Sequence, residues 1–353
     1  AFVALELVSL SLYALTALHQ TRRTSAEAAL KYLTYGGVST AFLLFGLSYF
    51  YGMTGALDLS AASAAVPSSP LITVAYLFIL VGLGFKIAVA PFHLWAPDVY
   101  QAAPTPAAAW IASGSKIAGV ALLLALLGPV SLPSAHSTIV PLLLLMAVAS
   151  MAVGNLGALR QANVKRLLAY SAIANAGYLL VGLVALSNDG RAATLFYVLV
   201  YSLATLGAFS VVSIIGGRLG RDAEIDDFRG CWKTMPGMAG LMFFFILSLA
   251  GIPPLAGFIG KYYLFFAAIK GHAGISGWSE GWYWLVVLAL VMSVVSLYYY
   301  LKVLKAFLVF DEEDRPEVEI NPVVRMALII LAVCVIMLGL FPEPVLDIFI
   351  AAG

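Results

Sequence analysis

The sequence predicts an all-α protein that crosses a membrane about ten times. Hydrophobic residues make up 62% of the chain, and its mean hydropathy is +0.99. Apolar runs of about 20 residues recur along the chain, and a run of that length spans the hydrocarbon core of a bilayer. These two observations exclude a soluble globular domain. The formal net charge is +1 and the basic residues are scattered, so nothing indicates nucleic-acid binding.

Hydropathy divides the chain into ten expected membrane helices, numbered here as spans one to ten. Each is a predominantly apolar stretch, and polar or turn-forming residues separate it from the next. The predicted spans are 1–18, 29–52, 71–94, 104–127, 138–158, 164–187, 192–216, 238–269, 282–310 and 322–350.

Basic residues are unevenly distributed between the two sets of connecting loops. If the loop after span one is cytoplasmic, thirteen Lys and Arg residues fall on the cytoplasmic side and only Arg191 and Lys270 on the other. Cytoplasmic loops of membrane proteins are typically enriched in Lys and Arg. The asymmetry supports ten spans and predicts a multi-pass membrane protein with an outer, periplasmic C-terminus. The prevalence of Ala, Leu and Gly favours a bacterial source, and hence the bacterial cell membrane. The thirteen are Arg22, Arg23, Arg160, Lys165, Arg166, Arg218, Arg221, Arg229, Lys233, Lys302, Lys305, Arg315 and Arg325.

Span one carries Glu6, the only carboxylate deep within an apolar run. A buried carboxylate usually needs a cationic partner, and a lysine beside it would be held in its charged form. Moving that partner would change the protonation of the lysine, so such a pair is suited to proton loading. The chain starts inside this apolar run without an initiator methionine, and we expect it to be truncated at its N-terminus.

Three lysines lie inside apolar runs: Lys86 in span three, Lys116 in span four and Lys261 in span eight. A charged side chain at the centre of a membrane helix costs roughly 2.5–3.5 kcal/mol, so three cost on the order of 8–10 kcal/mol. A merely structural protein would be expected to lose them, and we interpret them as functional. Lys31 is a further candidate, although its position near the start of span two also permits snorkelling.

Prolines are expected to break two of these lysine-bearing helices. Pro91 follows Lys86 in span three, and Pro253 and Pro254 precede Lys261 in span eight. The two spans are antiparallel in the predicted topology and five spans apart, which is typical of inverted repeats with broken helices beside an ion path. The alternative is an ordinary proline kink with a snorkelling lysine. The expected divisions are 1–127 for the end of a first repeat, 128–310 for a second, and 311–353 for a cytoplasmic turn and final helix.

Uncharged polar residues supply second-rank candidates. Ser171, Asn175 and Tyr178 of span six share one helical face, where they line a wetted path or hold helices together by hydrogen bonds. His93 lies close to the break of span three, as a proton relay or as an interfacial histidine bonded to backbone. Cys231 and Cys334 occupy different contexts and suggest neither a disulfide nor a metal site.

Three segments carry a resemblance to a known family. They are GFKIAVAPFHLWAPDVYQAAPTPAAAWIASGSKIAG (84–119), NVKRLLAYSAIANAGYLLVG (163–182) and GIPPLAGFIGKYY (251–263). The chain resembles the antiporter-like membrane subunits of NADH:quinone oxidoreductase (respiratory complex I), most of all the subunit N group. The resemblance implies a fourteen-helix fold, of which about ten helices are present here.

The resemblance also assigns roles to individual residues. It implies that Glu6 pairs with Lys86, that Lys116 connects the two halves, and that Lys261 belongs to the second broken helix, with Lys31 as a further member. The implied function is proton translocation through these lysines, driven by redox chemistry elsewhere.

The sequence shows no Gly-rich phosphate loop, CxxC pair or haem-type histidine pair, so no cofactor or metal is expected in this chain. The resemblance places NADH, FMN, Fe–S clusters and quinone in partner subunits. The expected partners are neighbouring membrane subunits, the peripheral redox arm and membrane lipid. Two alternatives stay open: a subunit of a cation/proton (Na⁺/H⁺) antiporter and a scaffold subunit that does not pump.

Overall fold

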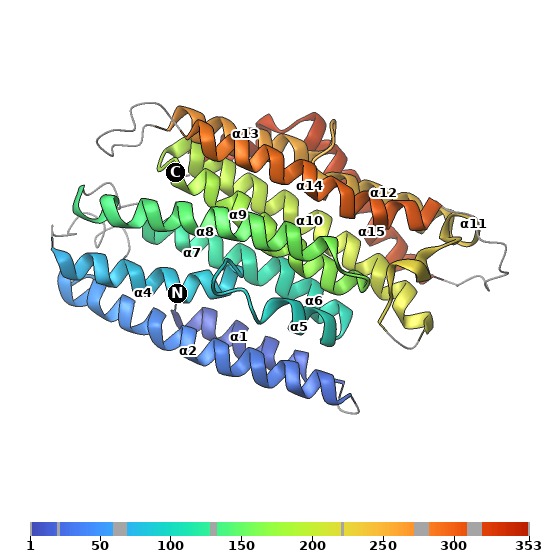
Figure 1. Ribbon diagram of the computed structural model, residues 1–353, viewed down its shortest axis with the longest axis horizontal. Coiled ribbons are helices and arrows are strands. Elements are labelled where there is room, and N and C mark those ends of the chain that lie inside the picture. Colours follow the sequence, from blue (N-terminus) through green and yellow to red (C-terminus); the bar gives the residue numbers. More distant parts are fainter. Residues whose placement is uncertain are drawn as a thin grey trace.

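Long helices lie side by side along the longest axis of the molecule (Figure 1). The computed structural model describes residues 2–19, 22–58, 69–127, 133–219, 222–271, 282–308 and 320–351. Within those ranges all named elements are helical, and one isolated bridge joins Asn163 to Glu224. The predicted all-α class is therefore confirmed.

The chain follows a serial order of helices. The first part comprises α1 (Phe2–Thr16), α2 (Arg23–Thr54), α4 (Pro70–Ile87), α5 (Ala96–Ala102), α6 (Thr105–Trp110) and α7 (Lys116–Leu127). The second comprises α8 (Pro133–Leu159), α9 (Val164–Val184), α10 (Asn188–Leu219), α11 (Cys231–Thr234), α12 (Pro236–Ala250), α13 (Ala256–Lys270), α14 (Tyr283–Leu308), α15 (Pro322–Leu340) and α16 (Glu343–Ala351).

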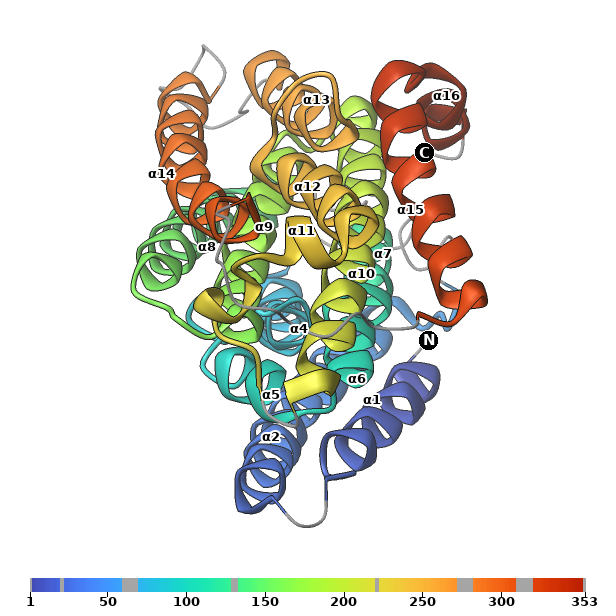
Figure 2. The same cartoon turned by 90° about the vertical axis from the view of Figure 1, so that its right-hand side faces the viewer.

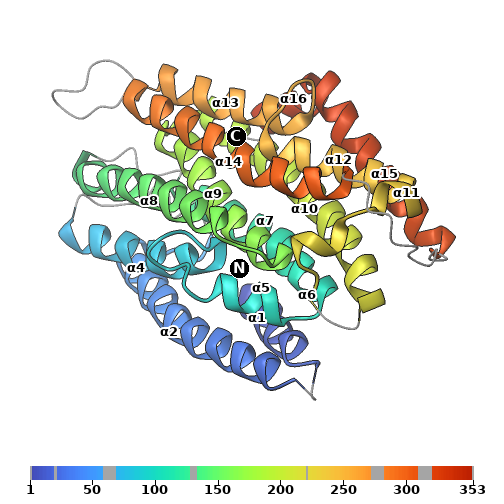
Figure 3. The same ribbon diagram turned by 45° about the vertical axis from the view of Figure 1, so that its right-hand side comes forward.

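Helix α9 lies at the centre of the bundle. Its residues are almost all buried, and it contacts α5, α8, α10, α13 and α14. The end-on view shows α9 and α10 in the middle, α1 and α2 at one edge, and α13 and α16 at the other (Figure 2). In the oblique view α8, α9 and α10 separate α1, α2 and α4 from α12 to α15 (Figure 3). Polar groups on α9 are therefore withdrawn from the bundle surface.

The described helices account for the ten expected membrane crossings. Eight are long and apolar enough to span a membrane, and two shorter apolar helices are Phe2–Thr16 and Pro236–Ala250. The chain is thus a multi-pass membrane protein. The predicted cytoplasmic turn at the start of 311–353 lies outside the described residues, and the division at 127 and 310 stays a prediction.

The predicted breaks of spans three and eight are both present. Helix α4 ends at Ile87, because Pro91 clashes with the carbonyl four residues earlier and cannot donate a hydrogen bond, and α12 and α13 are separate helices on either side of Pro253 and Pro254. Two other spans differ from the predicted continuous helices. Span ten was expected to run from 322 to 350, but Phe341 and Pro342 separate α15 from α16. Span four contains a π-helical turn, η1 (Ile111–Ser115), immediately before Lys116.

Glycines allow α8 and α9 to pack with their backbones close together. A Cβ at Gly154 of α8 would lie 2.3 Å from the Ala174 nitrogen of α9, and one at Gly177 would lie 2.8 Å from the Met151 nitrogen. Small residues at membrane helix interfaces permit such an approach, which gives van der Waals contact and short interhelical hydrogen bonds. This contact positions the polar face of α9.

We expect Gly154→Ala to destabilise the protein by about 1–3 kcal/mol, because a methyl group there meets backbone atoms that cannot move aside. The measurement is the thermal unfolding midpoint of the purified protein in detergent. Gly37→Ala is the matched control, since a Cβ at Gly37 of α2 meets no atom within 4 Å. Equal midpoints for the two variants would contradict the proposed role of the α8–α9 contact.

Candidate functional site

The first helix break exposes backbone groups that a serine of another helix satisfies. Ala88 follows α4 in the left-handed conformation with φ 59°, and the chain does not become helical again until Ala96. The Ala90 nitrogen donates to Ser150 Oγ of α8 at 2.8 Å. Non-helical backbone at membrane depth needs such internal partners. Ser150 therefore supports the break that Pro91 imposes.

Lys86 lies in the last turn of α4, directly before this break, and is paired with a carboxylate. Its Nζ is 3.2 Å from Glu6 Oε1 of α1 and donates to Ser9 Oγ at 2.5 Å. The side chain of Lys86 is 3% exposed and that of Glu6 is 20% exposed. The structure thus brings together the two residues that the family resemblance implies as a pair, and adds Ser9 to them.

Lys116 begins α7 and is fully enclosed. Its Nζ donates to the Ala172 carbonyl of α9 at 2.6 Å and lies 4.8 Å from the ring centroid of Tyr201. A backbone carbonyl and an aromatic face both stabilise a cation, although less strongly than a carboxylate does. The π-helical turn η1 ends at the residue before Lys116, and π turns often occur at functional positions.

The second break repeats this arrangement in α12 and α13. Gly251 has φ 82°, and α13 resumes at Ala256 after Pro253 and Pro254. The amide of Gly257 donates to Ser248 Oγ at 3.2 Å. A serine therefore supports each break, from another helix in the first case and from the same broken span in the second.

Lys261 reaches back across this break to the end of α12. Its Nζ donates to the carbonyls of Leu249 and Ala250 at 3.5 and 3.3 Å and lies 4.8 Å from the Tyr178 ring centroid. The C-terminal carbonyls of a helix carry partial negative charge, so they favour a cation. Among the described residues, no carboxylate lies within ion-pairing distance of Lys116 or Lys261.

Packing contacts connect Lys86, Lys116 and Lys261 in series through α7 and α9. Gly119 of α7 lies against Lys86, because a Cβ there would be 3.3 Å from Lys86 Cβ, and Lys116 precedes Gly119 by one turn. The acceptor of Lys116 is Ala172 of α9, and the ring that faces Lys261 is Tyr178 of the same helix. Six residues of α9 span about 9 Å.

Buried hydroxyl and amide groups fill the space beside α9. Tyr197 donates its hydroxyl to Asn175 Oδ1 at 2.5 Å, and Asn175 Nδ2 donates to Ser171 Oγ at 3.2 Å. Ser171 in turn is hydrogen-bonded to Tyr300 of α14. All four side chains are buried. The predicted pair Ser171 and Asn175 therefore joins three helices through hydrogen bonds.

A second branch of this network reaches Lys261 through Tyr178. Asn155 of α8 donates to the Tyr178 hydroxyl at 3.2 Å and accepts from the Tyr299 hydroxyl at 3.1 Å. The rings of Tyr299 and Tyr300 have centroids 4.5 Å apart, so the two branches meet on α14. Sequence reasoning missed Asn155, Tyr299 and Tyr300. Asn155 is a single amide in an apolar stretch of α8, and nothing in the run Tyr298–Tyr300 of α14 marks two of its three rings as part of a site.

Lys31 belongs to a separate ionic cluster. Its Nζ lies 2.9 Å from Glu27 and 3.0 Å from Asp98 Oδ2, and its side chain is 41% exposed. Arg166 of α9 binds the other oxygen of Asp98 at 2.8 Å and also contacts Gln101. In sequence, Asp98 follows Pro97 and resembles a turn or cap residue, but its carboxylate joins α2 to α9. The structure does not bring Lys31 to the three enclosed lysines.

His93 lies in the first break, and its side chain lines an apolar cavity. Leu145, Met146 and Val153 of α8 line the same cavity. No hydrogen bond or ion pair within the described part of the chain joins the His93 ring to one of the lysines.

Comparison with known proteins identifies the family. A model of the family described as "NADH:quinone oxidoreductase/Mrp antiporter, TM" matches residues 1–296. The chain belongs to this family. It is 45% identical to NADH-quinone oxidoreductase subunit N 2 of Acidobacterium capsulatum, over 97% of this chain and 70% of that protein.

Solved structures agree with this family membership. A chain of respiratory complex I from Thermus thermophilus with bound aureothin is 41% identical with a TM-score of 0.81, over 98% of this chain and 74% of that chain. A chain of the Mrp complex from Dietzia sp. is 22% identical with a TM-score of 0.87, over 99% of this chain and 72% of that chain. At that identity the Mrp comparison supports the fold alone. The antiporter-like membrane fold expected from sequence is therefore confirmed.

Two opposing effects act on the pKa of the Asp98 carboxyl. Burial raises this pKa, but the hydrogen bonds and charges of Lys31 and Arg166 together lower it by more than burial raises it. The pKa of Asp98 therefore lies below the ordinary value. A carboxyl of this kind stabilises the folded protein above its unfolded pKa of about 3.9, and the contribution is lost as the pH falls through the lower folded pKa.

We expect Asp98→Asn to destabilise this antiporter-like chain by about 1 kcal/mol at neutral pH, because partly exposed ion pairs are screened by solvent. The difference from wild type should shrink as the pH falls below about 4. Thermal unfolding in detergent across pH measures both effects. Asp226→Asn is the control. The Asp226 side chain also pairs with an arginine, Arg229, but it is 76% exposed, so solvent screens this pair more strongly. A difference that grows toward acid pH would refute the assignment.

Proposed function

We propose that this chain is a proton-translocating membrane subunit of a NADH:quinone oxidoreductase, of the subunit N type. The observation that carries the proposal is the unequal pairing of the enclosed lysines. Lys86 has a carboxylate partner, Glu6, whereas Lys116 and Lys261 are held by backbone carbonyls and aromatic rings. The Glu6–Lys86 pair can therefore act as a switch, because its charge balance changes when the two residues separate. Lys116 and Lys261 can act as sites that gain and lose a proton.

The proposed cycle starts at the Glu6–Lys86 pair. Separation of Glu6 from Lys86 would leave an ammonium beside Ser9 without a counter-charge, and transfer of its proton toward Lys116 would relieve that cost. The positive charge on a protonated Lys116 would then repel the positive charge on a protonated Lys261. Lys261 would therefore release its proton toward the outside. The buried hydroxyls of Ser171, Tyr197 and Tyr300 lie beside this route.

Energy for the cycle is proposed to come from other subunits. One elementary charge that crosses 100 mV requires about 2.3 kcal/mol. No cofactor is assigned to this chain, and we place NADH, FMN, Fe–S clusters and quinone in the partner subunits of the complex. Neighbouring antiporter-like subunits and, indirectly, the peripheral arm are the proposed partners. Relatives that carry the name NADH-quinone oxidoreductase subunit N support this assignment.

Cation/proton antiport is a second candidate function, because the fold is shared with a chain of the Mrp complex. It would use the same lysines. Co-purification distinguishes the two: the proposed function requires that the native chain isolate together with a peripheral arm that contains flavin and Fe–S clusters. A scaffold subunit that does not pump is the third candidate, and it is excluded if single lysine variants lose pumping.

We expect Glu6→Gln and Lys86→Met to lower the rate of proton pumping by the assembled complex at least several-fold, because both remove the switchable ion pair. Pumping is measured as acidification coupled to NADH oxidation in reconstituted vesicles. Lys233→Met is the matched control, since Lys233 is an exposed lysine outside the lysine series. Normal pumping by assembled complexes that carry Glu6→Gln or Lys86→Met would contradict both the proposed function and cation/proton antiport. The scaffold function would then be the remaining candidate.

A further inference from the structure

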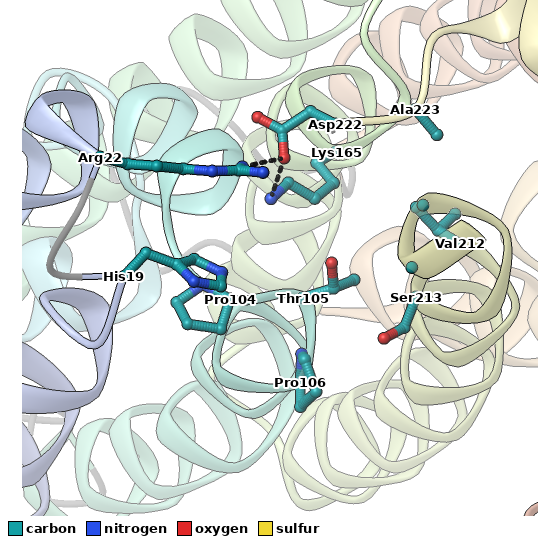
Figure 4. A pocket seen from close by; sticks show the side chains of 12 residues that line it. His19, Arg22, Pro104, Thr105, Pro106, Lys165, Val212, Ser213, Asp222 and Ala223 are labelled. Carbon is teal, nitrogen blue, oxygen red and sulfur yellow. Dashed lines mark ion pairs between the residues drawn. The ribbon is translucent and has the colours of Figure 1, made fainter. Parts of the chain in front are cut away.

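A cavity of about 280 Å³ lies at the end of the bundle that the basic-residue asymmetry assigns to the cytoplasm. It is bordered by the residues after α1, the start of α6, the start of α9 and the end of α10. His19, Arg22 and Lys165 contribute basic side chains to its wall, and Asp222 contributes the one carboxylate of its lining (Figure 4). The residues of the proposed translocation route do not line it.

Lys165 and Arg22 share a single carboxylate oxygen, Asp222 Oδ1. Lys165 Nζ lies 2.9 Å from Asp222 Oδ1 and also donates to the Ala103 carbonyl at 2.9 Å. Arg22 Nη1 lies 3.6 Å from the same oxygen. Figure 4 shows both side chains converging on Asp222, with His19 and Thr105 beside them. Two positive charges and one negative charge leave the cavity with a net positive charge before His19 is counted.

The two cations differ in how accessible they are. The Lys165 side chain is 4% exposed, so its ammonium is a fixed, buried element of the wall. The Arg22 side chain is 38% exposed, and its contact with Asp222 is long. A guanidinium presents five donors in a planar fork that matches the oxygens of a phosphate group. Arg22 is therefore suited to bind a phosphate while it remains beside Asp222.

Apolar side chains near the cavity indicate a lipid rather than a soluble anion. Leu15 and Leu18 at the end of α1 are 40% and 62% exposed, and Leu219 at the end of α10 is 38% exposed. In the chain, Leu18 directly precedes His19, Leu15 lies one turn earlier, and Leu219 follows Gly217 by two residues; His19 and Gly217 line the cavity. A phosphate with attached acyl chains satisfies both the cationic wall and the apolar surroundings. Basic pockets between membrane helices on the cytoplasmic side bind anionic head groups in this way.

We propose that this cavity binds the phosphate of an anionic phospholipid from the cytoplasmic leaflet, with Arg22 as the principal ligand. The Lys165–Asp222 pair forms the fixed part of the site, and the Thr105 hydroxyl lies within its lining. A bound lipid would tie the segment between α1 and α2 to α9 and α10, which belong to the second predicted repeat. The inference goes beyond the proposed function, because lipid binding does not depend on proton transfer by the lysines.

The experiment uses the intact complex, purified in mild detergent and transferred to nanodiscs that contain phosphatidylglycerol in phosphatidylcholine. Native mass spectrometry counts the phosphatidylglycerol that stays bound. We expect Arg22→Gln to weaken this binding at least tenfold and Arg22→Lys to have a smaller effect, because lysine keeps the charge but not the fork. Arg23→Gln is the matched control, since Arg23 is the exposed neighbouring arginine and does not line the cavity.

Equal losses in Arg22→Gln and Arg23→Gln would overturn the proposal, because they would reflect general attraction to a basic surface. Unchanged binding in an assembled Arg22→Gln complex would also overturn it. A second arm adds millimolar inorganic phosphate. Retention of the lipid supports the assignment, whereas complete displacement would identify a site for a soluble anion and overturn the lipid proposal. Proton pumping, measured in parallel, reports separately on the proposed function.

Discussion

An ammonium group enclosed by membrane helices needs electron-rich partners, and this requirement shapes the centre of the molecule. Prolines interrupt two helices at membrane depth, and the interruptions leave carbonyl oxygens without helical donors. Lys261 binds two carbonyls at the end of α12, so this break and this lysine stabilise each other. Lys86 lies in the last turn of α4 beside the other break, but its partners are Glu6 and Ser9.

The three lysines nevertheless differ in their charged neighbours. The two ends of the series, Lys86 and Lys261, are therefore not equivalent. Glu6 and Ser9 surround the Lys86 ammonium, whereas the Tyr201 ring faces Lys116 and the Tyr178 ring faces Lys261. Among the residues that the structure describes, a carboxylate pairs with Lys86 but not with Lys116 or Lys261, so moving a carboxylate alters the first site alone. The hydroxyl and amide network along α9 lies beside the second and third sites, where protein groups take the place that water has around an exposed lysine.

Much of this arrangement could be predicted from sequence, because lysine in an apolar run is costly and proline breaks a helix at a definable position. The ten crossings, both breaks and the Glu6–Lys86 pair follow from such local rules or from the family resemblance. The contribution of Tyr299 and Tyr300 could not be predicted. Both belong to the run Tyr298–Tyr300, and the run alone does not show which tyrosines face the bundle. Only the packing of α14 against α8 and α9 places Tyr299 next to Asn155 and Tyr300 next to Ser171.

The environment of Lys31 also could not be predicted from sequence. Its sequence position permitted either a place among the buried cations or an interfacial one, and the structure places it with Glu27, Asp98 and Arg166 in a partly exposed cluster. Asp98 follows a proline and resembles a turn residue in sequence. Its ionic role arises because α5 packs on α9, a contact between segments more than sixty residues apart.

The central claim is that Lys116 connects the switchable pair to the far end of the series. Its most direct test is the number of protons pumped per NADH oxidised by the assembled complex that carries Lys116→Met. A methionine of similar length fills the space against Tyr201 but cannot hold a proton. The account predicts fewer protons per NADH than in wild type. An unchanged stoichiometry in a fully assembled complex would contradict it.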